Sequence, residues 1–370
     1  MTGDAAASPL NIELEEGTLI PAEQVKPRSR GQTCCIICCS CFLVPIVAFI
    51  LFVLIYPLSL TEVRADWNEY LDTTPPIVEE TVMAVLKRAQ SLVLNATNIT
   101  KATMPYNLDV VISGGGSLSY YWLGISTVLK VYESMNYTKL HRFAGASAGA
   151  QEPFKAVAMQ RGESVRVGKN LFSVPKIINI SPDSSQHKHL ETALAYALVV
   201  ENHKHKFSND LYAAVAADVV WKDLGRFLES QYLHNQTVLD DLTDKVFVQV
   251  TLLNLWSGKL LSTYTDANQA RQAFIATGSA FVQYEGSLAV DGGGTDCAPH
   301  FKDGKRTQLV VTLTDSGLPM RMVTRIYGLN DVVAAVHKGQ DDIIAWLQGG
   351  EVPALEFKDE VTSWPHFSCL

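Results

Sequence analysis

A serine between two glycines stands at residues 145–149, which read Gly-Ala-Ser-Ala-Gly. Ser147 is the candidate nucleophile of this G-x-S-x-G motif, and Gly145 and Gly149 allow a sharp turn where a helix passes close to a strand. The backbone N–H of Ala148, at the start of that helix, would point at a developing oxyanion. A serine hydroxyl is a weak nucleophile at neutral pH, so the reaction also needs a base and further hydrogen-bond donors.

A run of three glycines supplies candidate donors for the oxyanion. Gly114, Gly115 and Gly116 follow the apolar stretch 108–112, and glycines leave their N–H groups unobstructed at the start of a helix. The run lacks the Lys-Ser/Thr of a phosphate loop, and Ser119 stands where a dinucleotide loop has its third glycine. We interpret the run as part of an oxyanion hole, with a plain turn as the alternative.

Asp291 is the candidate base. It follows an apolar stretch at 287–290, and Gly292 and Gly293 come next, so a substrate or another stretch of backbone can approach closely. A carboxylate at the end of a strand could accept the proton of the Ser147 hydroxyl. The alternative is an ordinary Asp-Gly turn.

Histidine is the competing base, because many serine hydrolases carry Ser, Asp and His in that order along the chain. His300, His337 and His366 follow Asp291, but none of them stands in a recognisable motif.

Four other histidines form two His-Lys-His pairs: His187, His189, His203 and His205. A zinc site is one interpretation, and we favour a solvated loop or helix face. We expect the chemistry of this chain to need no metal and no cofactor.

The elements around the motifs alternate between strand and helix. A buried strand at 108–112 precedes an amphipathic helix at 118–132, a second strand at 142–144 and a helix at 148–159. This is a βαβ unit, and its right-handed crossover makes the two strands parallel neighbours. The glycine run and the serine turn therefore both fall at the carboxyl ends of strands, where such sheets bind ligands.

The rest of the chain continues the alternation and predicts an α/β domain with a mostly parallel central sheet. We expect paired strands at 246–252 and 259–264, a helix at 270–281, strands at 287–290 and 308–313, and a last helix that Asn330 caps and Gly349 and Gly350 end.

An apolar segment precedes all of these elements. No charged residue occurs between residues 31 and 61, and residues 33–60 are long enough to cross a bilayer as one helix. Lys26, Arg28 and Arg30 lie before it and mainly acidic residues follow, which predicts a cytosolic N-terminus and a catalytic domain outside or in a lumen. The alternative is a buried core helix or a shallow hairpin, which would leave the enzyme in the cytosol.

Five N-x-[ST] sequons follow the segment, at Asn95, Asn98, Asn136, Asn179 and Asn235. They are candidate N-glycosylation sites and agree with a lumenal or extracellular catalytic domain.

Five of the seven cysteines lie in the first half of the membrane segment: Cys34, Cys35, Cys38, Cys39 and Cys41. A cluster at the cytosolic end is typical of S-palmitoylation, and the alternative is that these are simply small apolar residues in lipid. Cys297 and Cys369 lie beyond the membrane, where they could pair in an oxidising lumen or both stay free.

In this order, the motifs resemble those of patatin-like phospholipases, a family of lipid acyl hydrolases. The resemblance rests on VISGGG at 111–116, GASAGA at 145–150 and DGG at 291–293, with ATGSAF at 276–281 ahead of the last motif. It covers roughly residues 106–315, and the three motifs together are far more specific than any one of them.

The resemblance implies a three-layer α/β/α fold and cleavage of acyl esters of glycerolipids by a Ser147–Asp291 dyad without histidine. It assigns the oxyanion region to Gly114, Gly115, Gly116 and Ala148. Many members carry a basic residue just after the glycine run, where this chain has Ser117-Leu-Ser119. That departure favours neutral lipids or lysolipids as substrates over intact phospholipids.

Three aromatic residues follow the glycine run: Tyr120, Tyr121 and Trp122. They could line an acyl pocket or touch the membrane interface, and we favour a place in the core for some of them.

Two other functions fit part of the pattern. An α/β-hydrolase-type esterase with a Ser-His-Asp triad would depend on a C-terminal histidine and not on Asp291. A catalytically silent, membrane-tethered protein that binds lipid would be indifferent to the loss of the Ser147 hydroxyl.

The composition of the chain limits the classes of molecule that it is expected to bind. A net charge of −8 over 370 residues argues against nucleic acid, and we expect a lipid substrate at a membrane surface, with the oligomeric state left open. We divide the chain into five parts. A disordered cytosolic tail (1–32) precedes a transmembrane signal anchor (33–60) and a helical spacer (61–104). A patatin-like catalytic domain (105–350) and a C-terminal tail (351–370) follow.

Overall fold

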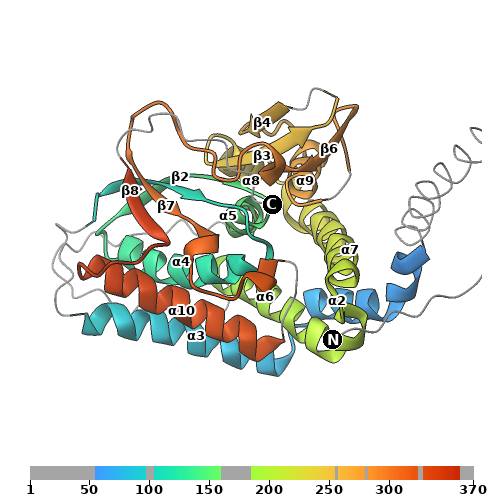
Figure 1. Cartoon of the computed structure of the whole chain (residues 1–370), viewed down its shortest axis with the longest axis horizontal. Helices are drawn as coiled ribbons and strands as arrows, with labels where there is room; N and C mark the ends of the chain where they lie inside the picture. Colours follow the sequence, from blue (N-terminus) through green and yellow to red (C-terminus); the bar gives the residue numbers. More distant parts are fainter. Residues whose placement is uncertain are drawn as a thin grey trace, which may run out of the picture. The chain divides into compact units, whose positions relative to one another are not determined.

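The computed structural model describes residues 55–96, 104–159, 185–254, 257–279, 282–323 and 328–358. All of them belong to one structural unit, which begins at Val53 (Figure 1). The predicted tail, membrane span and membrane cysteines lie outside the described residues. Within the described ranges, no helix is both long and apolar enough to cross a bilayer.

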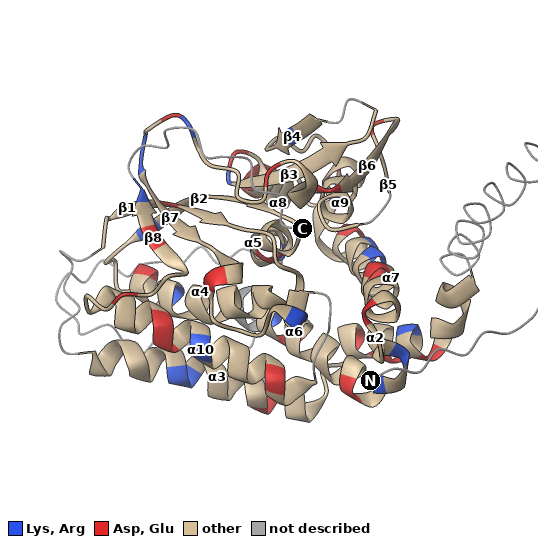
Figure 2. Ribbon diagram, viewed as in Figure 1, with Lys and Arg blue, Asp and Glu red and all other residues tan. Residues whose placement is uncertain are grey.

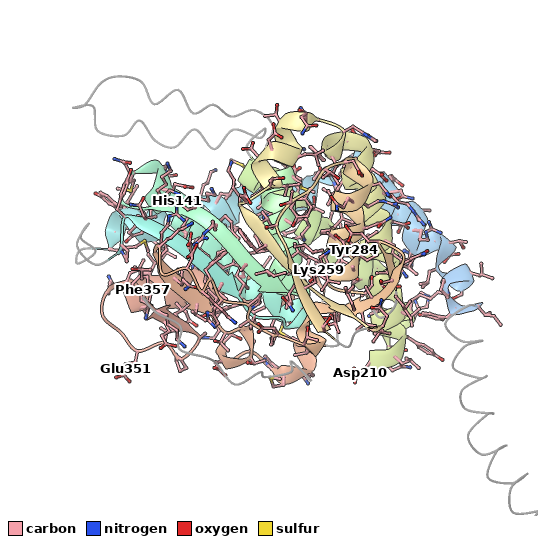
Figure 3. The ribbon with its side chains drawn as sticks, turned by 90° about the horizontal axis from the view of Figure 1, so that it is seen from above. His141, Asp210, Lys259, Tyr284, Glu351 and Phe357 are labelled. Carbon is pink, nitrogen blue, oxygen red and sulfur yellow. The ribbon has the colours of Figure 1, made fainter. Side chains whose placement is uncertain are left out.

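An eight-stranded sheet forms the centre of this unit, with the order β5-β6-β3-β2-β1-β7-β8 and with β4 paired to β3. The strands are β1 (Asn107–Ile112), β2 (Lys139–Ala146), β3 (Val246–Leu252), β4 (Ser257–Leu261), β5 (Val282–Tyr284), β6 (Ser287–Asp291), β7 (Thr307–Val311) and β8 (Leu355–Lys358). Figure 3 labels Tyr284 on the β5 edge and Phe357 on the β8 edge.

The four central strands are parallel, and antiparallel strands are added at both sides. This confirms the predicted mixed α/β class and the parallel pairing of β1 with β2. β1 reads as a nearly continuous apolar run, because both of its faces are buried in the middle of the sheet.

Helices cover one face of the sheet (Figure 1). They are α2 (Thr61–Asp72), α3 (Pro76–Asn95), α4 (Ser119–Ser134), α5 (Ala148–Ala158), α6 (Ser185–Asn202), α7 (Asp210–Leu228), α8 (Gln236–Leu242), α9 (Ala267–Ala276) and α10 (Leu329–Leu347). α10 lies along α4, and α3 packs outside both of them. Figure 2 shows acidic and basic residues along the outer helices α3, α7 and α10.

The segment 61–104 contains helices, as predicted, but it is not a spacer. Val63 and Trp67 of α2 and Val82 and Val85 of α3 are fully buried in the same core as the sheet. The predicted boundary at residue 105 is therefore wrong, because an apolar helix stripe does not reveal what it packs against. At the other end, β8 pairs with β7 and extends the unit beyond residue 350.

Two helix boundaries also differ from the prediction. α10 begins without a side-chain cap from Asn330, since Gly328 is its N-cap residue and the Leu329 N–H donates to Glu201 Oε2 at 2.9 Å. Gly349 follows the helix with a φ of 91°, as expected for a glycine stop. α9 ends at Ala276, and the next residue, Thr277, turns the chain toward the site.

The opposite face of the sheet carries a smaller apolar cluster, made of Val111, Ala144, Val310 and Phe301. No helix of the described ranges contributes to this cluster. In the part of the chain that the structure describes, helices cover one face of the sheet and a loop covers the other, so the second helical layer that the resemblance implies is not seen there.

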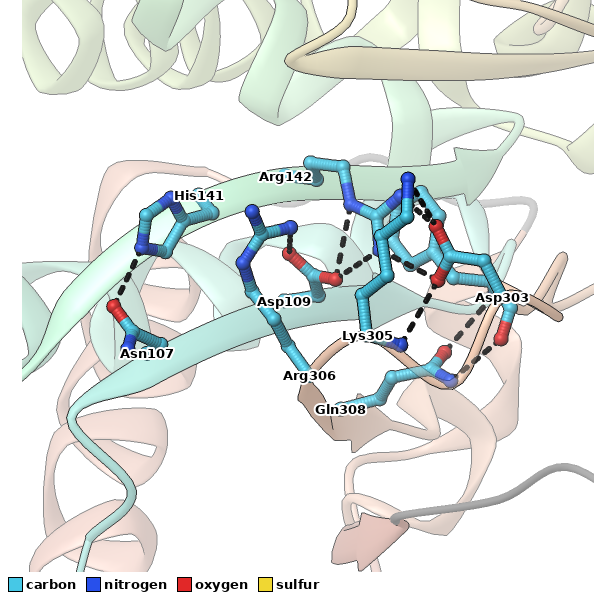
Figure 4. A network of polar contacts seen from close by, with 9 residues as sticks. Asn107, Asp109, His141, Arg142, Asp303, Lys305, Arg306 and Gln308 are labelled. Atoms are coloured by element: carbon cyan, nitrogen blue, oxygen red, sulfur yellow. Dashed lines mark hydrogen bonds and ion pairs between the residues drawn. The ribbon is translucent and has the colours of Figure 1, made fainter.

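A polar network lies beside this smaller cluster (Figure 4). Asp109 of β1 is fully buried, and Arg142 of β2 donates to it from Nε at 2.9 Å and to Asp303 from Nη1 at 2.7 Å. The Arg142 guanidinium also lies 4.0 Å from the ring centroid of Phe301. These contacts fix the loop across the end of the sheet that is remote from the serine turn.

Candidate active site

Ser147 stands at the turn between β2 and α5 with a φ of 52° and a ψ of −135°. Such a backbone conformation is strained for a residue with a side chain, as in a nucleophile elbow. A Cβ added to Gly149 would lie 2.3 Å from the Ser113 carbonyl oxygen, and one added to Gly145 would lie 2.5 Å from that of Gly149. The close pass of helix and strand that the motif predicts is present.

Asp291 is the hydrogen-bond partner of the nucleophile candidate. Ser147 Oγ donates to Asp291 Oδ2 at 2.7 Å, and the Gly293 N–H donates to Asp291 Oδ1 at 2.8 Å. β6 brings Asp291 to this place by pairing with β3, where it lies opposite Val250. The sequence places these residues 144 positions apart, and the sheet brings them into contact.

Burial raises the pKa of Asp291 above its ordinary value, and the hydrogen bonds from Ser147 and Gly293 only partly oppose this effect. Within the described residues, Asp291 forms no ion pair that would stabilise its charge. A carboxylate with a raised pKa is a better proton acceptor, which is the property that a general base needs.

The glycine run differs in part from the prediction. The Gly114 N–H donates to the Cys297 carbonyl at 2.9 Å, so it is not available to an oxyanion, and the assignment of Gly114 as a donor is wrong. The N–H groups of Gly115, Gly116 and Ala148 have no acceptor among the described residues. These three remain the candidate donors.

Gly116 could not be replaced by a larger residue without a shift of the backbone. Its φ is 52°, and an added Cβ would lie 2.0 Å from the Val323 carbonyl oxygen. The glycine run is thus held against the segment Met320–Val323.

No histidine takes the place of Asp291. The Ser147 side chain bonds to Asp291, and the Asp291 carboxylate bonds to Ser147 and Gly293. His337 lies on α10 near Arg88 and Asp341. His300 lies on the loop that covers the second sheet face, and His366 falls outside the described residues.

The predicted solvated surface is wrong for His189 and is confirmed for His205, which is exposed. His189 is buried, and its Nε2 lies 2.6 Å from Glu152 Oε2. His203 Nε2 lies 2.8 Å from Asp66 Oδ2, and the His187 side chain falls outside the description. Across the described ranges, no three His, Cys, Asp or Glu side chains come together as a metal site would require.

The three aromatic residues after the glycine run are core residues. Tyr120, Tyr121 and Trp122 are at most 3% exposed, so they do not reach a membrane interface. The Tyr121 hydroxyl donates to Asp342 Oδ2 at 2.8 Å, which ties α4 to α10.

A cavity of about 910 Å³ lies beside the site but does not contain it. Its lining includes Arg142, Phe247, Gln249, Thr295 and Phe301, on the face of the sheet that the loop covers. Neither Ser147 nor Asp291 lines it.

Three of the predicted glycosylation sites are described, and all three are exposed: Asn95, Asn136 and Asn235. Asn98 and Asn179 lie outside the described residues. Cys297 is disulfide-bonded, so it does not stay free.

Sequence reasoning missed one residue of the site. The Ser147 N–H donates to the Thr277 hydroxyl at 2.9 Å. The only signal was the stretch ATGSAF at 276–281, whose similarity to the family pattern does not by itself assign a role to Thr277.

No protein-family model matches this chain, and no curated protein matches its sequence. The resemblance to patatin-like phospholipases therefore rests on the motifs and on the site alone.

Proposed function

We propose that this chain is a patatin-like serine lipid acyl hydrolase that cleaves acyl esters of glycerolipids through a Ser147–Asp291 dyad. The observation that carries the proposal is the 2.7 Å hydrogen bond from Ser147 Oγ to Asp291 Oδ2, at an elbow where the serine backbone is strained. A nucleophile, a base in contact with it and nearby N–H groups that have no acceptor in the described part of the chain are the parts that acyl transfer requires.

Each group has a defined part in the proposed reaction. Asp291 accepts the Ser147 proton while Oγ attacks the acyl carbon, and the N–H groups of Ala148, Gly115 and Gly116 stabilise the oxyanion. The intermediate collapses, and the leaving alcohol takes the proton from Asp291. A water molecule then attacks the acyl-serine with Asp291 as its base, which releases the fatty acid and restores the hydroxyl.

The proposal includes a membrane anchor at 33–60 that holds the catalytic unit near insoluble substrate on the lumenal or extracellular side. Exposed sequons at Asn95, Asn136 and Asn235 and a disulfide at Cys297 support an oxidising compartment. A cytosolic catalytic unit is the alternative. The uncharged Ser117-Leu-Ser119 supports neutral lipids or lysolipids as substrates.

Fatty-acid release by the full chain in mixed detergent micelles tests the proposal, with triacylglycerol, lysophospholipid and phospholipid supplied separately. We expect hydrolysis of at least one lipid by the wild type and by a His337→Ala/His366→Ala double variant. Ser147→Ala and Asp291→Asn should be inactive. A dead histidine variant would favour the triad esterase, and a folded wild type inactive on all three lipids would favour a lipid-binding protein.

A further inference from the structure

The nucleophile elbow is held by a hydroxyl outside the dyad. Thr277 is fully buried just after α9, and its Oγ1 accepts from the Ser147 N–H at 2.9 Å while it donates to the Gln249 carbonyl at 2.7 Å. A hydroxyl has one proton to donate. The bond to Gln249 uses that proton, so a lone pair of Oγ1 is directed at Ser147.

The place of this bridge in the sheet explains its use. Direct pairing of β2 with β3 ends at Ala146 and Gln249, one residue before the nucleophile. The positive φ of Ser147 turns the chain that follows out of the strand and into α5. The Thr277 hydroxyl spans the opening between the Ser147 N–H and the Gln249 carbonyl, and it satisfies two buried backbone groups at once.

Thr277 also reaches the other half of the dyad. Its carbonyl oxygen accepts from the Gly292 N–H at 2.9 Å, directly after Asp291. One residue is therefore bonded to the backbone of the nucleophile and to the backbone next to the base. The Thr277 side chain fixes the backbone of Ser147, and the Thr277 main chain fixes the backbone next to Asp291.

We propose that Thr277 is a positioning residue, whose hydroxyl holds Ser147 in the backbone conformation that aims Oγ at Asp291 and at the substrate. The inference rests on the proposed hydrolase function. Strained conformations persist only where surrounding contacts enforce them, and this hydroxyl is the side-chain contact made by the Ser147 N–H.

The chain offers a matched control in Thr127 of α4. Thr127 is also buried, donates to a backbone carbonyl (Gly124, at 2.7 Å) and accepts from an N–H (Gln340 Nε2, at 3.0 Å). It ties α4 to α10 and makes no contact with the dyad. Thr127→Val removes the same kinds of bond as Thr277→Val.

The test measures kcat and KM for a p-nitrophenyl acyl ester, with thermal unfolding to correct for the folded fraction. We expect Thr277→Val to lower kcat about 10²-fold at a nearly unchanged KM, since small displacements of reacting groups have effects of this order. Thr277→Ser keeps the hydroxyl and should recover most of kcat. Thr127→Val should lower the melting temperature and keep kcat per folded molecule.

Three results would overturn the inference: wild-type kcat in Thr277→Val, no recovery in Thr277→Ser, or an equal loss of kcat in Thr127→Val. If Thr277→Val does not fold, Thr277→Cys replaces it, because a thiol is the weaker hydrogen-bond partner and kcat should still fall below that of Thr277→Ser. A wild type that neither turns over the ester nor reacts with a fluorophosphonate at Ser147 would instead refute the hydrolase function itself.

Discussion

Two carboxylates near the nucleophile helix α5, Glu152 fully buried and Asp291 partly buried, have opposite surroundings. Glu152, inside α5, is 1% exposed and contacts Lys155 Nζ at 2.7 Å and His189 Nε2 at 2.6 Å. Asp291, next to the N-terminus of α5, bonds among the described residues only to the Ser147 hydroxyl and to the backbone N–H of Gly293. Both lose hydration on folding, but of the two only Glu152 contacts a cationic side chain among the described residues, that of Lys155, because burial lowers the pKa of His189.

The difference appears in the proton affinity of the two groups. Burial alone would raise the pKa of Glu152, but the charges and hydrogen bonds of Lys155 and His189 outweigh burial and lower it. For Asp291 burial dominates and the pKa is raised. Glu152, whose charge is balanced by Lys155, stabilises the packing of α5 and α6. Asp291 has no such neighbour among the described residues and keeps a raised pKa, which suits a general base.

The largest expected effect is on activity. Ser147→Ala removes the nucleophile and Asp291→Asn removes the base, so each should lower kcat for lipid hydrolysis by at least about 10³-fold. Glu152→Gln, the matched change at the other carboxylate, should keep most of the kcat per folded molecule. Equal losses of kcat in Asp291→Asn and Glu152→Gln would contradict the assignment of Asp291 to catalysis and of Glu152 to packing.

The next largest effect is on stability. Lys155→Met leaves Glu152 buried without its cationic partner, and breaking a buried ion pair on one side costs about 3–5 kcal/mol of unfolding free energy. Denaturant titration of the full chain in detergent measures this loss. A decrease below about 1 kcal/mol, the range of exposed pairs, would mean that the buried pair does not stabilise α5.

The two carboxylates should respond oppositely to neutralisation. Asp291→Asn removes a charge that the fold disfavours, so the protein should melt at a higher temperature near pH 7, by about 2–4 °C for each kcal/mol gained. Glu152→Gln should melt at a lower temperature. A lower melting point for Asp291→Asn would indicate that its hydrogen bonds, and not its burial, dominate.

The pH dependence follows from the same shifts. A raised pKa means that folded protein holds the Asp291 proton more tightly than unfolded chain does, so this group favours folding at low pH and opposes it as the pH rises through the folded pKa. Glu152, with a lowered pKa, stabilises the fold at higher pH and loses that contribution as the pH falls through its folded pKa.

Because Asp291 must be ionised to accept a proton, kcat/KM should fall on the acid side with a midpoint above 3.8, the ordinary value for this residue. A stopped-assay pH series on the wild type measures this limb. A midpoint at or below the ordinary value would contradict a partly buried base that has no cationic partner among the described residues.

Much of this site could be predicted from the local sequence. The turn at Ser147, the glycines 145 and 149 that allow it, and the order of strand and helix around it follow from small residues and apolar periodicity. The pairing of β1 with β2 follows from the handedness of the crossover. These features are predictable because each depends on a few neighbouring residues.

Features that depend on distant partners could not be predicted. From the sequence, His189 is expected on the polar surface, because its contact with Glu152 is not visible there. In the same way, α3 is expected to be a spacer, because its packing against α4 and α10 is not visible. The sequence predicts Gly114 as a free donor, because it does not show that the Cys297 carbonyl accepts the Gly114 N–H. Thr277 shows no motif chemistry of its own, since its role arises only where β2, β3 and α9 meet.

The most direct test of the dyad is the site and rate of reaction with a long-chain alkyl fluorophosphonate, read by peptide mass spectrometry on the full chain in detergent. We predict one adduct, on Ser147, that forms readily in the wild type and in Glu152→Gln and at least about 10²-fold more slowly in Asp291→Asn. An adduct on another residue, no adduct on the folded protein, or an unchanged rate in Asp291→Asn would contradict the account.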